Sequence, residues 1–229
     1  MTRVILTAPA KGNIKNLVYG VNNDTITDAD TILSAASCTT NAITPVLKVM
    51  NDHFGILSGH VETVHSFTND QNLIDNYHKA DRRGRSAVLN MVITETGAAK
   101  AVAKALPELL GKLTGNSIRV PTPNVSMAIL SLTLETAASK EEINEFLRQV
   151  SLHSNLQDQI DYTNSTEAVS SDFIGSRSAG VFDAQATIVN GNRANLYVWY
   201  DNEMGYSCQV MRIAEQVSGT HYLHLPVEG

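Results

Sequence analysis

Hydrophobic and polar positions along this chain follow two periods, one typical of helices and the other of strands. After residue 38, apolar side chains recur at spacings of three and four, and Pro45 is the residue of this run that disfavours a helix. Ser139 and Glu142 have the spacing of a capping box, which marks a helix start. The predicted helices are 38–54, 98–106, 139–150 and 206–218.

Short or alternating apolar runs predict strands along the whole chain. Asn190 and Gly191 stand between two such runs and predict a hairpin with a primed turn. Strands and helices do not alternate strictly, so we expect an α+β fold with a mixed, mostly antiparallel sheet and helices packed on one face. The predicted strands are 4–8, 17–21, 31–35, 59–68, 125–135, 183–189 and 194–200.

Composition narrows the possible functions. The 229 residues are 43% apolar and 17% charged, which supports a sizeable core. The net charge of −6 argues against a nucleic-acid or anionic-membrane surface. Two distant cysteines suit a reducing compartment, and no apolar run is long enough for a signal peptide or a membrane span. The sequence therefore predicts a soluble, cytoplasmic protein.

Cys38 is the first candidate for chemistry. Ser37 is placed to cap the predicted helix that follows, which puts Cys38 in the first turn. Free N–H groups and the helix dipole stabilise an anion there, so we expect a lowered thiol pKa and a nucleophilic role. A lone cysteine is more often an inert small hydrophobe. Hydroxyl residues on both sides argue against apolar burial and favour the nucleophile.

A cysteine nucleophile needs a base within hydrogen-bond reach. His65 is the best placed of the seven histidines, because its predicted strand follows the Cys38 helix and can fold back beside the start of that helix. A lone histidine on a strand is more often a core residue, and the pattern leaves both roles open. The histidines and cysteines do not show metal-ligand spacing, so no metal site is predicted.

Two features predict anion binding. Thr96 and Gly97 precede a predicted helix and would offer a hydroxyl and free N–H groups to a phosphate. The polar segment 69–86 is long for a loop and is rich in arginine, whose guanidinium group matches phosphate geometry. A solvated or subunit-contacting loop is the alternative reading of this segment. The sequence holds no G-x-G-x-x-G or Walker pattern for a nucleotide. The candidate arginines are Arg82, Arg83, Arg85 and Arg119.

Six motifs occur in a fixed order and closely resemble those of the phosphorylating glyceraldehyde-3-phosphate dehydrogenases. They are Ser-Cys-Thr-Thr-Asn (37–41), Thr-Val-His (63–65), Thr-Asn-Asp-Gln (68–71), Thr-Gly-Ala-Ala-Lys-Ala-Val (96–102), Arg-Val-Pro-Thr-Pro-Asn-Val-Ser (119–126) and Trp-Tyr-Asp-Asn-Glu-Met-Gly-Tyr-Ser (199–207). The resemblance covers nearly the whole chain but not the family's N-terminal nucleotide-binding half. It implies the last strands of a truncated Rossmann domain (1–37), a catalytic domain (38–201) and a C-terminal helix that packs on the dinucleotide-binding domain (202–229).

The resemblance also implies a role for each matching residue. Cys38 would attack glyceraldehyde 3-phosphate, and His65 would activate the thiol and assist hydride transfer to NAD. Inorganic phosphate would then split the thioester to give 1,3-bisphosphoglycerate, a step of glycolysis. The implied contacts are Thr68, Asp70 and Arg119 for the substrate phosphate, Ser37, Thr39, Arg83, Thr96 and Gly97 for inorganic phosphate, and Asn202 and Tyr206 for the nicotinamide.

The family's quaternary structure gives a further expectation. The segment 69–86 resembles the loop that lines the neighbouring subunit's cofactor site, so we expect a homo-oligomer, a tetramer when full length. Erythrose-4-phosphate dehydrogenase is an alternative enzyme with the same cysteine and histidine chemistry, although the motifs at 96–102 and 119–124 favour the first reading. A non-catalytic assembly module is the alternative from another class, because the cofactor half is absent from the sequence. The net charge of −6 weakens an RNA-binding version of that idea.

Overall fold

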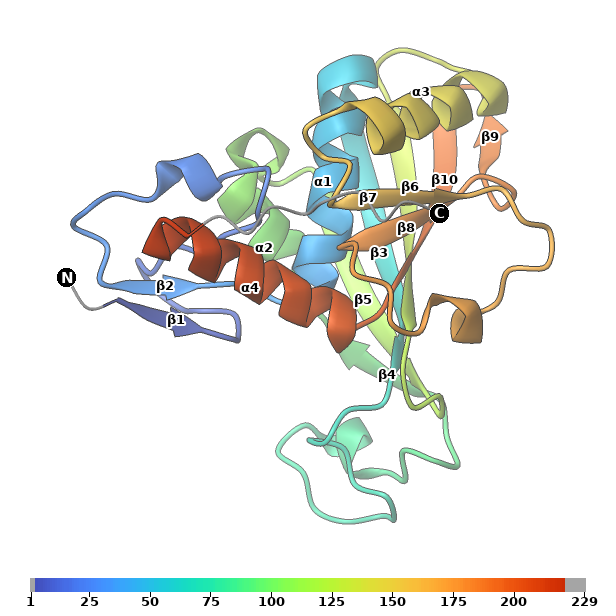
Figure 1. The fold of residues 1–229 in the computed structure, drawn as a ribbon. Coiled ribbons are helices and arrows are strands. Elements are labelled where there is room, and N and C mark those ends of the chain that lie inside the picture. Colours follow the sequence, from blue (N-terminus) through green and yellow to red (C-terminus); the bar gives the residue numbers. More distant parts are fainter. Residues whose placement is uncertain (1–2, 221–229) are drawn as a thin grey trace, which may run out of the picture.

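The computed structural model describes residues 3–220. An eight-stranded mixed sheet with strand order β4-β5-β3-β6-β10-β8-β7, and β9 paired with β10, forms the centre of the molecule (Figure 1). Only the β3–β5 and β7–β8 pairs of this sheet are parallel, so the predicted α+β class with a mostly antiparallel sheet is confirmed. Its strands are β3 (Ile56–Ser66), β4 (Val92–Glu95), β5 (Leu113–Val120), β6 (Ser126–Leu134), β7 (Ile160–Thr163), β8 (Gly180–Asp183), β9 (Ile188–Asn190) and β10 (Arg193–Tyr200).

Three helices pack on one face of this sheet: α1 (Cys38–Phe54), α2 (Ala98–Ala105) and α3 (Lys140–His153). Strict alternation of buried and half-buried residues along β6 directs its apolar side chains toward these helices. The capping box of Ser139 and Glu142 begins α3 as predicted. Pro45 lies inside α1 without ending it, because the buried apolar stripe of α1 continues on both sides of the proline.

A smaller unit lies beside the main sheet. The parallel pair β1 (Val4–Leu6) and β2 (Ile32–Ser34) packs with α4 (Met204–Ser218), and Leu17, Leu33 and Ile213 are fully buried between them (Figure 1). The helix ends at Gly219 in a left-handed conformation, as expected for a C-cap. The N-terminal segment and α4 thus share one small apolar core.

Two strand predictions are wrong. The run 17–21 is a turn, because the Asn22 side chain accepts the Val18 N–H and donates to the Asn16 carbonyl, which bends the backbone. The run 183–189 is interrupted after β8, where the Asp183 carboxylate accepts the Ala186 N–H.

The predicted hairpin follows β9, with a shift of one residue. Pairing of Asn190 with Arg193 makes Gly191 and Asn192 the central residues of the turn. Among the described residues a positive φ occurs at Gly191, at 62°, and not at Asn192, which fits a type II′ turn.

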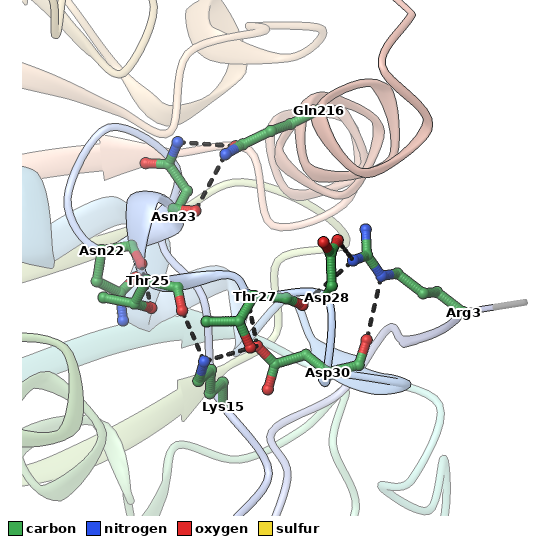
Figure 2. Close-up of polar contacts among 9 residues, drawn as sticks. All are labelled: Arg3, Lys15, Asn22, Asn23, Thr25, Thr27, Asp28, Asp30 and Gln216. Carbon is green, nitrogen blue, oxygen red and sulfur yellow. Dashed lines mark hydrogen bonds and ion pairs between the residues drawn. The ribbon is translucent and has the colours of Figure 1, made fainter. Parts of the chain in front are cut away.

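Polar side chains tie the N-terminal segment together (Figure 2). Lys15 Nζ lies 2.6 Å from Asp30 Oδ2 and also donates to the Thr25 carbonyl. Asn23 and Gln216 exchange two hydrogen bonds, Asn23 Nδ2 to Gln216 Oε1 at 2.8 Å and Gln216 Nε2 to the Asn23 carbonyl at 3.0 Å (Figure 2). The Asn23–Gln216 pair holds this segment against α4, and the Lys15 contacts close the segment on itself.

Replacing Asp30 with asparagine should loosen this segment. The hydrogen bond from Lys15 lowers the pKa of Asp30 to about 2, so the carboxylate stabilises the fold above its ordinary pKa and loses this effect as the pH falls toward 2. We expect faster amide hydrogen exchange at Thr27, whose N–H donates to Asp30 Oδ2, and unchanged exchange in β6. Asp28→Asn is the matched control, since its carboxylate is fully exposed and should contribute little. Equal exchange in both variants would contradict the prediction.

Candidate active site

The chain enters α1 through a tightly held turn. Ser37 is extended and its Oγ accepts the Thr40 N–H at 3.1 Å, which confirms the predicted N-cap. Ala36, just before it, has a positive φ of 55°, a strained conformation for alanine. The Asn41 side chain donates to the Ala35 and Ser37 carbonyls, which fixes the turn from inside the helix. Cys38 is thereby held at the first helical position.

His65 lies beside Cys38, as the sequence suggested. Its Nε2 is 3.6 Å from Cys38 Sγ, and its Nδ1 is 2.7 Å from the Ser66 carbonyl. A carbonyl oxygen only accepts, so Nδ1 carries the proton and Nε2 turns its lone pair toward the thiol. Arg119 Nη1 lies 3.1 Å from the same Nδ1 and 3.2 Å from the Ser66 carbonyl. Two donors do not bond to each other, so with the proton on Nδ1 the guanidinium donates to the carbonyl and places its charge beside the ring. The geometry is that of a thiol facing a general base.

The two groups are uncharged in the resting protein. Burial raises the pKa of Cys38, although hydrogen bonds from Thr39 act in the opposite direction. The prediction that the helix start lowers this pKa is therefore wrong for the resting state, because desolvation outweighs the local N–H groups. Burial first, and the charge of Arg119 second, lower the pKa of His65 to about 4. At neutral pH the neutral imidazole is able to take the thiol proton.

Two arginines meet next to this pair. The register of β3 and β5 places Arg119 opposite His65. The Arg119 guanidinium donates to Thr68 Oγ1 at 3.1 Å. The Thr68 hydroxyl donates to Asp70, whose other oxygen lies 2.6 Å from Arg83 Nη2. The predicted substrate-phosphate residues and Arg83 thus form one connected polar cluster.

A cavity of about 270 Å³ opens beside Cys38. The predicted residues Ser37, Cys38, Thr39, His65, Arg83, Thr96, Gly97 and Arg119 all line it. The sequence did not single out Thr63, Glu95 and Ser117, which line it as well. A larger cavity of about 700 Å³ lies at the end of α1 and the start of α3, but it holds neither the thiol nor an arginine. The smaller cavity is the candidate active site because it combines a nucleophile, a base and two guanidinium groups.

Asn202 and Tyr206 are not among the residues that line this cavity, but each contacts a residue close to His65 or Cys38 in the sequence. Asn202 Oδ1 accepts hydrogen bonds from Ser66 Oγ at 2.7 Å and Ser126 Oγ at 2.9 Å. Tyr206 donates to the Ala36 carbonyl at 3.0 Å, and burial raises its pKa to about 12. With its oxygen engaged, Asn202 has its amide nitrogen left to donate, and that nitrogen has no partner within the described part of the chain. This donor is suited to a carbonyl oxygen of a bound group.

The polar segment 69–86 forms a loop that projects from the sheet beyond β4 (Figure 1). The loop is closed by its own contacts, since Asp75 accepts the Ser86 N–H at 2.8 Å and pairs with Arg85 at 3.1 Å. Arg83 points back to the site and pairs with Asp70. Several large apolar side chains along and just after the loop are exposed, namely Leu73, Ile74, Tyr77, Leu89 and Met91.

Among residues 3–220, no three histidine, cysteine, aspartate or glutamate side chains are grouped so that they could hold a metal ion. In the same residues, no helix has the length and apolar character needed to cross a membrane.

The sequence is similar to that of known proteins of one family. Residues 37–202 match the family profile described as glyceraldehyde 3-phosphate dehydrogenase, C-terminal domain. A glyceraldehyde-3-phosphate dehydrogenase-like protein of Pseudomonas aeruginosa is 69% identical over 219 residues, covering 96% of this chain and 48% of the relative. Glyceraldehyde-3-phosphate dehydrogenase 2 of Nostoc sp. is 45% identical over 218 residues, covering 94% of this chain and 64% of the relative.

The chain spans about half the length of the Pseudomonas relative and somewhat more of the Nostoc one. The profile match covers α1, the whole eight-stranded sheet and both arginines of the cavity, so it includes the lining of the cavity beside Cys38 except Pro9. This chain therefore belongs to the glyceraldehyde-3-phosphate dehydrogenase family.

Proposed function

We propose that the cavity beside Cys38 oxidises the aldehyde of glyceraldehyde 3-phosphate and transfers the acyl group to inorganic phosphate, with NAD as the oxidant. The observation that carries the proposal is the Cys38–His65 pair, with its 3.6 Å separation, at the mouth of a cavity lined by Arg83 and Arg119. A nucleophile, a base and two cationic anion-binding groups are the parts that acyl transfer to phosphate requires.

The first step forms a carbon–sulfur bond. As Cys38 Sγ attacks the aldehyde carbon, its proton moves to His65 Nε2, the nitrogen that faces the thiol. The carbonyl electron pair passes to oxygen, and the protonated imidazole donates a hydrogen bond to that oxygen. The protonated His65 gives up its proton readily because its pKa is low. Loss of hydride from the same carbon then leaves a thioester on Cys38.

The second step transfers the acyl group. A phosphate oxygen attacks the thioester carbon, the carbon–sulfur bond breaks, and the Cys38 thiolate leaves to be protonated again. We assign the substrate phosphate to Arg119 and Thr68, with Asp70 orienting the threonine hydroxyl. We assign the attacking phosphate to Arg83 and to the groups at the starts of α1 and α2, which are Ser37, Thr39, Thr96 and Gly97. Helix N-termini favour anions at both places.

Asn202 and Tyr206 fit the nicotinamide end of NAD. Asn202 offers a free amide nitrogen near Ser66, the residue after His65, and Tyr206 is fixed by its bond to Ala36, two residues before Cys38. When bound, NAD would supply the hydride acceptor. The 229 residues contain no glycine-rich dinucleotide turn, so we expect this chain alone to show no appreciable NAD reduction. We also propose that the loop 69–86 contacts a neighbouring subunit through its exposed apolar side chains.

Acyl transfer can be tested without the oxidant, because the second step runs in reverse from an acyl phosphate. Incubation with acetyl phosphate should acetylate Cys38, measured by intact and peptide mass spectrometry. His65→Asn should slow the reaction about 10²-fold or more, the usual contribution of a general base. Cys208, on α4 and away from the cavity, is an internal control that should stay unmodified.

Equal acetylation of Cys38 and Cys208, or an unchanged rate in His65→Asn, would overturn the proposal.

A second experiment addresses the substrate. Assembly of this chain with the nucleotide-binding half of a relative would allow turnover of glyceraldehyde 3-phosphate to be compared with turnover of erythrose 4-phosphate. A higher specificity constant for the second aldehyde would replace the proposed substrate while leaving the acyl-transfer chemistry in place.

A further inference from the structure

Ser117 on β5 has a buried hydroxyl without a hydrogen-bond partner among the described residues. The residue is 3% exposed and lines the cavity beside Cys38. A buried hydroxyl left without a partner is destabilising, because it gives up its hydrogen bonds to water and gains none. Such a group in a native protein calls for an explanation, and its position in the wall of the active cavity suggests one.

The other hydroxyls of this cavity already have partners within the protein. Ser37 and Thr40 bond to each other at 2.7 Å, and Thr39 bonds to Tyr200 at 2.9 Å. Thr63 donates to the Asn116 carbonyl, and Thr96 accepts the Ala98 N–H. Among the described residues that line the cavity, Ser117 is thus the one whose hydroxyl neither donates nor accepts a hydrogen bond.

The strand register fixes where this hydroxyl lies. Ser117 pairs with Thr63 on β3 and with Thr94 on β4, and it shares a face of β5 with Arg119, two residues later. Gly115, two residues earlier on the same face, is close to Thr96, since a Cβ at Gly115 would lie 3.4 Å from Thr96 Cγ2. Ser117 therefore stands between the Arg119 guanidinium and the start of α2.

Two more unpartnered polar atoms belong to the same cavity. Arg83 Nε and Arg119 Nε are buried and have no partner in residues 3–220, and both arginines line the cavity with Ser117. Guanidinium N–H groups and a serine hydroxyl are all donors to an oxyanion. Three such donors on residues that line one cavity point to ligands rich in acceptor oxygens, as the two proposed phosphates are.

We propose that Ser117 binds the attacking phosphate, donating its Oγ–H to a phosphate oxygen between Arg119 and α2. This proposal rests on the function proposed above and adds a residue to it. The ligand class is inorganic phosphate or another tetrahedral oxyanion. A serine hydroxyl changes direction by rotation about χ1 alone, between staggered positions. A hydroxyl adds a directional hydrogen bond to the site without adding to its positive charge.

The test is protection of Cys38 from alkylation by inorganic phosphate. The full 229-residue chain is treated with iodoacetamide over a range of phosphate concentrations, and the rate at Cys38 gives the dissociation constant of phosphate. Ser117→Ala should weaken phosphate binding about tenfold, the effect of losing one hydrogen bond to a charged group. Ser117→Thr keeps the hydroxyl and should restore most of the affinity.

A control variant and a zero-phosphate rate separate binding from structure. Ser131→Ala removes a hydroxyl from β6 at a position whose side chain lies on the opposite face of the sheet from the helices, so its phosphate affinity should equal that of the wild type. The alkylation rate without phosphate should be the same in all variants, which a merely structural role of Ser117 would not predict.

The outcomes distinguish this inference from the proposed function. Equal phosphate affinity in Ser117→Ala and the wild type, or no protection of the wild type by phosphate, would overturn the role of Ser117. Weaker binding in Ser117→Ala, with Cys38 unreactive toward acetyl phosphate, would keep the anion site and refute acyl transfer. Weak binding in both Ser117→Ala and Ser117→Thr would also count against a hydrogen-bonding role.

Discussion

Acidification from pH 6.5 to pH 4 is expected to lower the free energy of unfolding by about 3 kcal/mol through His65 alone. The figure follows from the pKa of this histidine, which burial, the largest cause, lowers from 6.5 in the unfolded chain to about 4 in the folded protein. In this pH range the unfolded chain binds a proton at this histidine and the folded protein does not. Protonation therefore favours unfolding, so stability is complete above pH 6.5 and falls as the pH drops toward 4. The residue is 5% exposed, so solvent screens the effect only slightly.

The measurement is urea unfolding at several pH values between 7 and 4. The wild type should lose more stability over this range than His65→Asn, which has no titrating group at this position. Carboxylates with lowered pKa values, such as Asp30 and Asp70, contribute equally to both proteins and cancel in the difference. His60→Asn on the same strand is the matched control, because its ring is about half exposed, and it should behave like the wild type. Parallel curves for the wild type and His65→Asn would refute the prediction.

The helices were predictable because their signals are local. Periodic apolar positions and the Ser139–Glu142 capping box lie within a few residues of each other, and α1 and α3 begin where these signals place them. The strand β5 was missed because its sequence, with Gly115 and Asn116 in the centre, has low strand propensity. Pairing with β3 on one side and β4 on the other makes it a strand. The β3–β5 pairing joins residues more than 50 positions apart in the sequence.

In the candidate site, too, local features could be predicted from the sequence, whereas features that depend on tertiary structure could not. Ser37 and Cys38 could be placed at a helix start from their neighbours, and the structure confirms this position. The residues alone left the role of His65 open, because its distance from Cys38 depends on how β3 folds back on α1. The thiol pKa was predicted in the wrong direction for a related reason. The helix start is visible in the sequence, whereas the burial that outweighs it is a tertiary property.

Arg119→Gln is expected to have the largest effect on anion binding. The guanidinium donates to Thr68 and to the Ser66 carbonyl and lines the cavity, so its loss should weaken binding of inorganic phosphate at the substrate-phosphate position about hundredfold, the effect of removing charge-assisted hydrogen bonds. The same change should raise the pKa of His65, because the positive charge of Arg119 is the second cause of its lowering. That pKa should remain below its ordinary value, since burial, the larger cause, persists.

Phosphate protection of Cys38 measures the first effect, and NMR titration of the His65 ring measures the second. Arg85→Gln is the matched control, because Arg85 pairs with Asp75 on the exposed loop and should change neither quantity. An altered phosphate affinity with an unchanged His65 pKa would show that Arg119 holds the anion without acting on the base. A shift of both together would mean that one guanidinium keeps the imidazole neutral while it binds the phosphate. In that case, a bound phosphate that offsets the Arg119 charge should itself make His65 a stronger base.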